Sequence, residues 1–399
     1  MTELPKNFSL NSVPSVFVSS ASSLKSGGGG VQIWTQENLK TLQAAGFATS
    51  IISYEWDRRL WVRLKRKLCP EPYTDALPPS LVDDVIAQAE KISAEFIFLN
   101  GEEASALVKP LRARLSRQYK VVLFSVGLAS VDYLHTIRSR GGGDAFSQAN
   151  FTDLRVIAQQ LVAECKQRQD IDHVFCLAPF EVEIERWLGA KRVTWLPRTI
   201  SERPLNWQPN PKRLGFVGTL DHPPTVEGLT LFLEALQKIA DQDVHLRIVG
   251  SPTAAASTIT KRFPLVEYLG RLSDEELEKE ASTWSCFVHP IFCYARGCST
   301  KLAVALGWQI PVVTTPAGCR GYSWREGILP LAETPESLAR LALEMLMPEV
   351  AHSAHREISA LAQSAPTLAE VAAQVRSSLL VSCQSADPVA VDDTVPINH

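Results

Sequence analysis

A run of glycines near the start of the chain has the composition of an anion-binding loop. Ser26-Gly27-Gly28-Gly29-Gly30 stands between an apolar run typical of a strand and a segment with helical spacing of apolar residues. Glycine lets the backbone approach a ligand closely, and a helix start offers unpaired N–H groups with a partial positive charge. The loop could hold a phosphate or a sugar hydroxyl, or it could be a flexible turn. It matches neither G-x-G-x-x-G nor the P-loop, so it does not support a nicotinamide site.

A second loop with similar properties occupies residues 295–301, with the sequence ARGCSTK. It follows a predicted strand and opens a predicted helix, its glycine permits a tight turn, and its serine or threonine can cap the helix. Arg296 and Lys301 add two cations, so amides and charge together could hold a diphosphate. The simpler alternative is a capped helix with solvated basic residues. A further glycine-containing segment, Thr314-Thr315-Pro316-Ala317-Gly318, favours the phosphate site.

Two further segments carry side chains with chemical potential. His135, with Arg138 and Arg140 after it, could hydrogen-bond a sugar hydroxyl or stabilise developing charge, although a lone histidine is more often structural. The segment Trp56–Leu68 is basic, and its apolar residues recur every four positions. It could be a helix on an anionic membrane surface, a surface helix packed on the core, or a contact for an anionic acceptor.

The sequence contains no pattern typical of a metal site or of a disulfide-bonded protein. No H-E-x-x-H, no G-x-S-x-G and no cysteine–histidine zinc spacing occurs, so we expect no metal site. The eight cysteines form no C-x-x-C pair and are scattered over a long chain. Reduced thiols in a cytosolic protein are therefore expected.

Short apolar runs alternate with amphipathic helical stretches along the whole chain, which predicts parallel sheets with right-handed crossovers. The predicted strands are 15–20, 48–54, 95–99, 120–125 and 173–178, then 213–217, 245–249, 266–269, 284–289, 311–315 and 328–331. A polar, proline-containing stretch at 201–212 separates the two series. We therefore predict an α/β protein with two doubly wound Rossmann-like domains that face a cleft, where ligands sit at the carboxyl ends of strands. The expected domains are 1–205 and 206–383, with a last helix that could cross back to the first domain and a flexible tail at 384–399.

The charge and the apolar segments of the chain disfavour a nucleic-acid-binding protein and a membrane-spanning one. The chain has 399 residues, 40 Lys and Arg, 43 Asp and Glu, and a net charge of -3, which disfavours a nucleic-acid partner. Neither a membrane-spanning segment nor a secretory signal is evident, so we expect a cytoplasmic protein that could lie peripherally on the inner face of the membrane.

The second half of the chain resembles the donor domain of group 1 glycosyltransferases. The matching segments, in family order, are Phe216–Glu227, Leu246–Gly250, Tyr268–Leu272, Phe287–Pro290, Lys301–Leu306 and Pro311–Thr315, followed by Gly321. The first half is compatible through its glycine loop, Tyr133-Leu134-His135, and Ala178-Pro179-Phe180-Glu181. The resemblance implies the GT-B fold, retention of anomeric configuration, independence of metals and other cofactors, and a nucleotide-sugar as co-substrate. It also implies that the second domain binds the donor and the first domain binds a carbohydrate, lipid-linked or protein acceptor.

The resemblance also assigns roles to individual residues. His135, Arg296 and Lys301 are the expected catalytic residues. The expected donor-binding residues are Gly28, Gly29, Gly218, Thr219, Arg271, Gly297, Cys298, Ser299, Thr300 and Val304. The family commonly has two glutamates eight positions apart around the phosphate loop, and here these positions fall near Arg296 and on Val304. The family's basic pair after the first donor-domain strand is also missing from residues 218–227.

Three functions are consistent with this pattern. The preferred one is a retaining hexosyltransferase that moves a sugar from a nucleotide-diphosphate sugar to an acceptor. A non-catalytic partner that keeps the fold is the second, because the glutamates are missing. A sugar-nucleotide epimerase on the same architecture is the third, and the fold alone does not separate the three.

Overall fold

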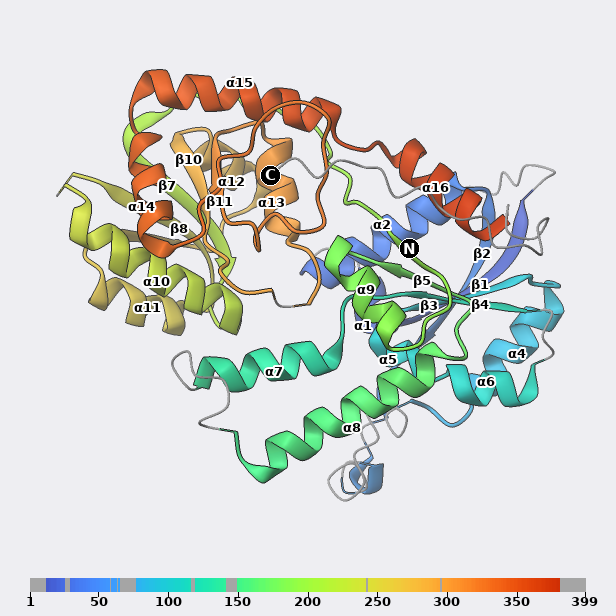
Figure 1. Cartoon of the computed structure of the whole chain (residues 1–399). Helices are drawn as coiled ribbons and strands as arrows, with labels where there is room; N and C mark the ends of the chain where they lie inside the picture. Colours follow the sequence, from blue (N-terminus) through green and yellow to red (C-terminus); the bar gives the residue numbers. More distant parts are fainter. Residues whose placement is uncertain are drawn as a thin grey trace.

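Two α/β domains follow each other along the chain, as the alternation of strands and helices predicts (Figure 1). The computed structural model describes residues 12–25, 29–57, 59–62, 64, 77–115, 119–140, 149–241, 243–294 and 296–380. The predicted tail at 384–399 and residues 58, 63 and 65–68 of the predicted basic helix at 56–68 therefore lie outside the described residues. From that segment the structure describes a short helical stretch around Leu60–Val62.

The first domain is built on a parallel sheet, which has six strands in the described part of the chain, in the order β2-β1-β3-β4-β5-β6. The strands are β1 (Val13–Ser20), β2 (Phe47–Tyr54), β3 (Phe96–Asn100), β4 (Lys120–Phe124), β5 (His173–Cys176) and β6 (Val193–Trp195). The helices are α1 (Ala21–Leu24), α2 (Gly30–Ala44), α4 (Leu81–Lys91), α5 (Glu102–Ser105), α6 (Val108–Arg114), α7 (Ala129–Arg140), α8 (Phe151–Arg168) and α9 (Pro179–Trp187). Because β1 pairs with both β2 and β3, the winding reverses between β1 and β3. The loops after these strands diverge there, which makes this edge a ligand-binding position.

The second domain has a parallel sheet in the order β11-β10-β7-β8-β9, with its reversal between β7 and β10. Its strands are β7 (Asn210–Thr219), β8 (His245–Ser251), β9 (Val266–Gly270), β10 (Trp284–His289) and β11 (Val312–Thr314). The helices of this half are α10 (Pro223–Ile239), α11 (Thr253–Arg262), α12 (Asp274–Ala281), α13 (Thr300–Gly307), α14 (Pro335–Glu344), α15 (Pro348–Ser364) and α16 (Leu368–Leu380). The loops that follow β7 and β10 therefore flank its ligand-binding edge.

The predicted last strand at 328–331 is wrong. This segment makes an isolated bridge between Leu331 and Thr314 and no longer ladder. Pro330 has no N–H to donate, so the segment cannot continue as a regular strand beside β11. Its carbonyl accepts a hydrogen bond from the Thr314 amide at 3.2 Å, and Thr314 accepts one from Ala332 at 2.9 Å.

Helix α16 packs on the first domain although it follows the second domain in sequence (Figure 1). Its side chains Val371, Val375 and Leu379 are buried in a cluster with the phenylalanines on one face of the first sheet. Those phenylalanines are Phe17, Phe47, Phe96, Phe98, Phe124 and Phe175. The chain thus crosses between the domains twice, once between β6 and β7 and once between α15 and α16.

Candidate functional site at the domain interface

The start of α13 lies where the two domains meet, at the carboxyl end of β10. A Cβ atom added to Gly30, the first residue of α2, would lie 3.2 Å from the side chain of Thr300, the first residue of α13. The N-terminal ends of two helices therefore meet across the interface, one from each domain. Gly29 is the N-cap of α2, whereas Gly28 lies outside the described residues.

A buried histidine fixes the residue that precedes α13. The hydroxyl of Thr314 donates to the His289 carbonyl at 2.8 Å, so its proton is used and it accepts from Nδ1 of His289 at 3.0 Å. In the neutral ring Nε2 is then unprotonated, and it accepts the hydroxyl proton of Ser299 at 2.8 Å. Burial, followed by the nearby Lys301 and Arg320, lowers the pKa of His289 to about 3, which keeps the ring neutral. Because His289 engages this hydroxyl, Ser299 makes no side-chain cap and leaves the first N–H groups of α13 uncapped.

Lys301 places a positive charge beside these N–H groups. Burial lowers its pKa to about 8, and no acidic side chain opposes this shift. No hydrogen bond or ion pair of Lys301 is found among the residues that the structure describes. Lys301 also lowers the pKa of His222, the N-cap of α10, in addition to the effect of partial burial. An uncompensated cation next to an uncapped helix start is a strong electrostatic trap for an anion.

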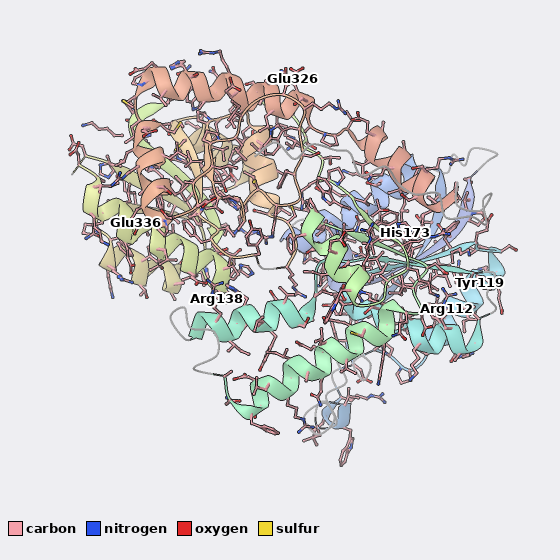
Figure 2. The ribbon with its side chains drawn as sticks, in the orientation of Figure 1. Arg112, Tyr119, Arg138, His173, Glu326 and Glu336 are labelled. Atoms are coloured by element: carbon pink, nitrogen blue, oxygen red, sulfur yellow. The ribbon has the colours of Figure 1, made fainter. Side chains whose placement is uncertain are left out.

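One ion pair and one histidine–carboxylate contact connect α7 of the first domain to the second domain. Nε of Arg296 lies 3.2 Å from Oδ2 of Asp132, and Nε2 of His135 lies 3.5 Å from Oε2 of Glu227 on α10. The His135 ring is buried, and the same Nε2 lies 3.8 Å from Sγ of Cys293. Figure 1 shows α7 below α10, and Figure 2 shows Arg138 near the end of α7 that lies farther from the first sheet. The predicted catalytic residues His135 and Arg296 thus both lie where α7 meets the second domain. We call this region, with Asp132 and Glu227, the interdomain seam.

The loop before α13 packs closely against the first domain. A Cβ on Gly127, which follows β4, would lie 2.4 Å from Cβ of Arg296 and 2.9 Å from N of Gly297. The Gly297 amide donates to Oε1 of Glu181 at 3.4 Å, so this predicted phosphate ligand already has an acceptor. Glu181 uses its other oxygen to accept two backbone N–H groups at the start of α9. Burial raises the pKa of Glu181, and these backbone hydrogen bonds oppose the shift.

The remaining predicted donor-binding residues divide into two groups. Cys298 lies inside the site, where a Cβ on Gly321 would come within 3.0 Å of it, and burial raises the pKa of its thiol. Gly218 lies in β7 next to Phe216, and Thr219, the last residue of β7, is exposed. Arg271, in contrast, follows the edge strand β9 and is exposed, with no polar partner among the described residues. Val304 is 43% exposed on α13, so it presents a hydrocarbon surface at the position where the resemblance places one of the family's glutamates.

Several contributors to the site were not predicted. Arg320 donates from Nε to the carbonyl of Gly297 at 2.8 Å and from Nη2 to that of Arg296 at 3.3 Å, which holds the loop. Tyr322 donates to the carbonyl of Ser299. The sequence indicates a role for Arg320 and Tyr322 only through their position shortly after β11. It does not show their partners, which are backbone atoms of a segment about twenty residues earlier.

Among the described residues no group of three or more potential ligands is arranged to hold a metal ion. A separate cavity of about 420 Å³ lies along α2. Thr199 and Ser201 from the first connection between the domains and Leu368 at the start of α16 also line it. Its lining is Lys25, Gln32, Ile33, Gln36, Glu37, Lys40, Thr41, Thr199, Ser201 and Leu368.

Comparisons with known proteins agree with this architecture. Residues 211–347 match the family model of the group 1 glycosyl transferases. A search of curated protein sequences finds no match. Sucrose-phosphate synthase from Thermosynechococcus elongatus has a similar structure, with 18% identity, 91% of this chain and 97% of that chain covered, and a TM-score of 0.66.

Two other solved structures are similar over their whole length. Anabaena HepE in complex with UDP and glucose shares 13% identity over 92% of this chain and 99% of its own, with a TM-score of 0.58. The lipopolysaccharide outer core galactosyltransferase WaaB shares 13% identity over 93% of this chain and 100% of its own, with a TM-score of 0.56. At these identities the likeness shows the fold, which is the two-domain GT-B fold, as the sequence predicts.

Proposed function

Because residues 211–347 match the group 1 glycosyltransferases and the whole chain has the GT-B fold, we propose that this protein is a hexosyltransferase. It takes a sugar from a nucleotide-diphosphate sugar and transfers it to a carbohydrate, lipid-linked or protein acceptor. The first domain binds the acceptor and the second binds the donor. Retention of anomeric configuration and metal independence are part of this proposal.

The single observation that carries the proposal is the uncompensated charge at the start of α13. When the bond between the sugar and the diphosphate breaks, its electron pair moves to the leaving oxygen and negative charge develops there. Uncapped N–H groups of α13 and the Lys301 ammonium can stabilise that charge more strongly in the transition state than in the bound donor. These groups would stabilise the leaving group without a metal ion.

Two contacts between the domains would have to change when a substrate binds. Asp132 lies against Arg296 and Glu227 lies against His135 at the domain interface. A donor diphosphate would compete with Asp132 for Arg296, and a sugar hydroxyl would compete with Glu227 for His135. Closure of the domains around the donor would then exclude water and suppress its hydrolysis.

The proposal is tested by replacing the cation without changing the fold. We expect Lys301→Met to reduce the rate of sugar transfer by about a hundredfold, the typical loss for one electrostatic contact to the leaving group. Lys238→Met, which removes an exposed lysine of α10, is the matched control and should be neutral. Nucleotide-sugars are screened by thermal shift, since a specific donor stabilises the fold by mass action. Transfer by Lys301→Met at the wild-type rate would refute the assignment.

We also propose a peripheral membrane contact through the segment Trp56–Leu68. Leu60 and Trp61 are 67% and 79% exposed, and the segment is rich in Lys and Arg. Apolar side chains beside basic ones suit an anionic lipid surface, such as the inner face of a cytoplasmic membrane. Among the described residues no helix is long and apolar enough to span a bilayer. Sedimentation with phosphatidylglycerol vesicles should retain the wild type and release Trp61→Ser, whereas equal retention would remove this proposal.

A non-catalytic partner protein is the second candidate, and Val304 favours it. Valine cannot accept hydrogen bonds from ribose hydroxyls, and its exposure leaves the site without that contact. Calorimetry with UDP, ADP and GDP separates the candidates. Binding of any of them that Lys301→Met weakens would support the enzyme, and no binding would support the partner protein.

A further inference from the structure

A completely buried cluster of charged residues lies behind the loop that packs against Arg296. It consists of Glu102 on α5, Glu185 on α9 and Arg168 on α8, with exposures of 1%, 1% and 0%. Arg168 donates from Nη2 to Oε2 of Glu102 at 2.8 Å, and to Glu185 from both Nε and Nη2. Ser125, the residue after β4, completes the cluster. Two carboxyl groups therefore share a single guanidinium in a site without water-exposed surface.

The hydroxyl of Ser125 determines how many protons the cluster holds. Its Oγ lies 2.9 Å from Oε1 of Glu102 and 3.0 Å from Oε1 of Glu185, and it also accepts from the Gly127 amide at 3.2 Å. A hydroxyl has one proton, so it can donate to only one of two carboxylates. If both were ionised, one of these short oxygen–oxygen contacts would bring two lone pairs together in a buried site.

One additional proton satisfies every contact. Glu185 accepts two hydrogen bonds from the guanidinium, which suits the ionised form, so the proton belongs on Oε1 of Glu102. Glu102 then donates to Ser125, Ser125 donates to Glu185, and the remaining lone pair of Ser125 accepts from Gly127. We propose that Glu102 is a proton-carrying positioning residue, and that its protonated form holds the Ser125–Gly127 loop against the loop of Arg296 and Gly297.

The electrostatic surroundings agree with this assignment. Burial raises the pKa of Glu102 to about 7, Arg168 opposes the shift, and Glu185 and Glu164 increase it. Glu164 on α8 is itself buried, and it accepts hydrogen bonds from the amide and hydroxyl of Ser130 at the start of α7. Glu181 on α9 adds another nearby carboxyl. Apart from Arg168, no cation among the described residues is paired with these acids.

Ionisation of Glu102 would affect the interface between the domains, because Gly127 connects the buried cluster to that interface. Above about pH 7 the Glu102 proton is lost, and Ser125 must give up its contact with one of the two carboxylates. The Ser125 oxygen, which accepts from the Gly127 amide, then shifts its position. Gly127 packs on Arg296 and Gly297, so we expect that loop to loosen as well. For the transferase proposed above, donor binding would weaken over the same pH range, and this last point rests on the proposed function.

The test is independent of catalysis. Hydrogen exchange, corrected for intrinsic rates, is followed at 125–128 and 296–298 at pH 6 and pH 8. Protection should fall about tenfold in the wild type, as one pH unit of ionisation beyond the pKa implies. Glu102→Gln keeps a donor to Ser125 and an acceptor for Arg168 at every pH, so its protection should not change. Glu103→Gln, the neighbouring carboxyl outside the cluster, is the matched control and should behave as the wild type.

Two results would contradict the proposal. If Glu102→Gln showed the wild-type pH dependence, the titrating group would be elsewhere. If Glu102→Gln failed to fold at pH 6, or lost protection there, Glu102 would be the ionised partner of Arg168. Loss of transfer activity without these changes would concern the proposed function only, which keeps the two conclusions separable.

Discussion

Lys301 and His289 are near each other but have opposite electrostatic roles. Burial weakens the charge of Lys301 without any acid to compensate it, so an anionic ligand would restore its full charge. Burial keeps His289 neutral, and a neutral ring is needed to accept the Ser299 proton. Lys301 is therefore a cation available to a ligand, whereas His289 holds the helix start in place.

His289 should make the stability of the protein sensitive to acid. Its folded pKa, about 3, lies below the ordinary 6.5, so the unfolded chain binds the extra proton first. Stability is therefore retained above pH 6.5 and falls as the pH decreases below it, by up to about 1.4 kcal/mol per pH unit. His289→Gln cannot titrate and should show a smaller slope between pH 4 and pH 6.5. Urea unfolding of both proteins measures this difference, and equal slopes would contradict it.

Individual residues were predictable from sequence where their chemistry is local. Gly30 and Lys301 were recognisable because each lies at or next to a helix start in the connection that follows a strand. Arg320 and Glu181 were not, because each binds backbone atoms that are close only in the folded chain. Nor could the sequence show that the Gly297 amide already has an acceptor, since its carboxylate comes from the other domain.

At the level of elements, buried parallel strands are the most predictable part of this fold. Each is a short apolar run between polar turns, so β1 to β5 and β7 to β11 agree with the predicted ranges to within a few residues. The segment at 328–331 has the same apolar character but contains Pro330, and its backbone cannot form a ladder. Hydrophobicity alone therefore misidentifies a segment whose hydrogen-bonding capacity is reduced.

The β4–α7 loop should be intolerant of any side chain at Gly127. This glycine has a φ of +99°, and an added Cβ would lie 2.4 Å from Cβ of Arg296. Gly127→Ala should therefore open the seam in addition to a backbone strain of about 1–2 kcal/mol. Gly189→Ala is the matched control, because φ is +101° there but the nearest atom is on the flexible side chain of Gln169.

Small-angle scattering distinguishes the two variants. The radius of gyration of Gly127→Ala should exceed that of the wild type, whereas Gly189→Ala should show strain without expansion. Equal radii for all three proteins would mean that the loop adapts without domain movement.

At the level of the whole molecule, the last described helix stabilises the first domain. Val375 of α16 is fully buried against the first sheet, whereas Ala373 on the same helix is exposed. Val375→Asp would bury an unpaired charge and should destabilise the protein by several kcal/mol. Ala373→Asp should change stability by no more than about 0.5 kcal/mol.

Hydrogen exchange locates the damage from Val375→Asp. Protection should decrease first in β1, β3 and β4, which are more than two hundred residues away in sequence, and later in β7 and β8. A loss confined to the second domain would contradict the role assigned to α16. The sequence allowed this crossing, because the last helix is amphipathic, but it could not show which sheet the apolar side contacts.

The position of α16 also affects how the protein is made. A ribosome releases residues 368–380 only after it has synthesised the whole second domain, so the part of the phenylalanine cluster that α16 covers stays exposed during that time, although α2 already packs on the rest. At about 5–20 residues per second, translation of the intervening chain takes on the order of ten seconds or more. The nascent first domain would need a chaperone, or a temporary cover from its own chain, before its final helix arrives.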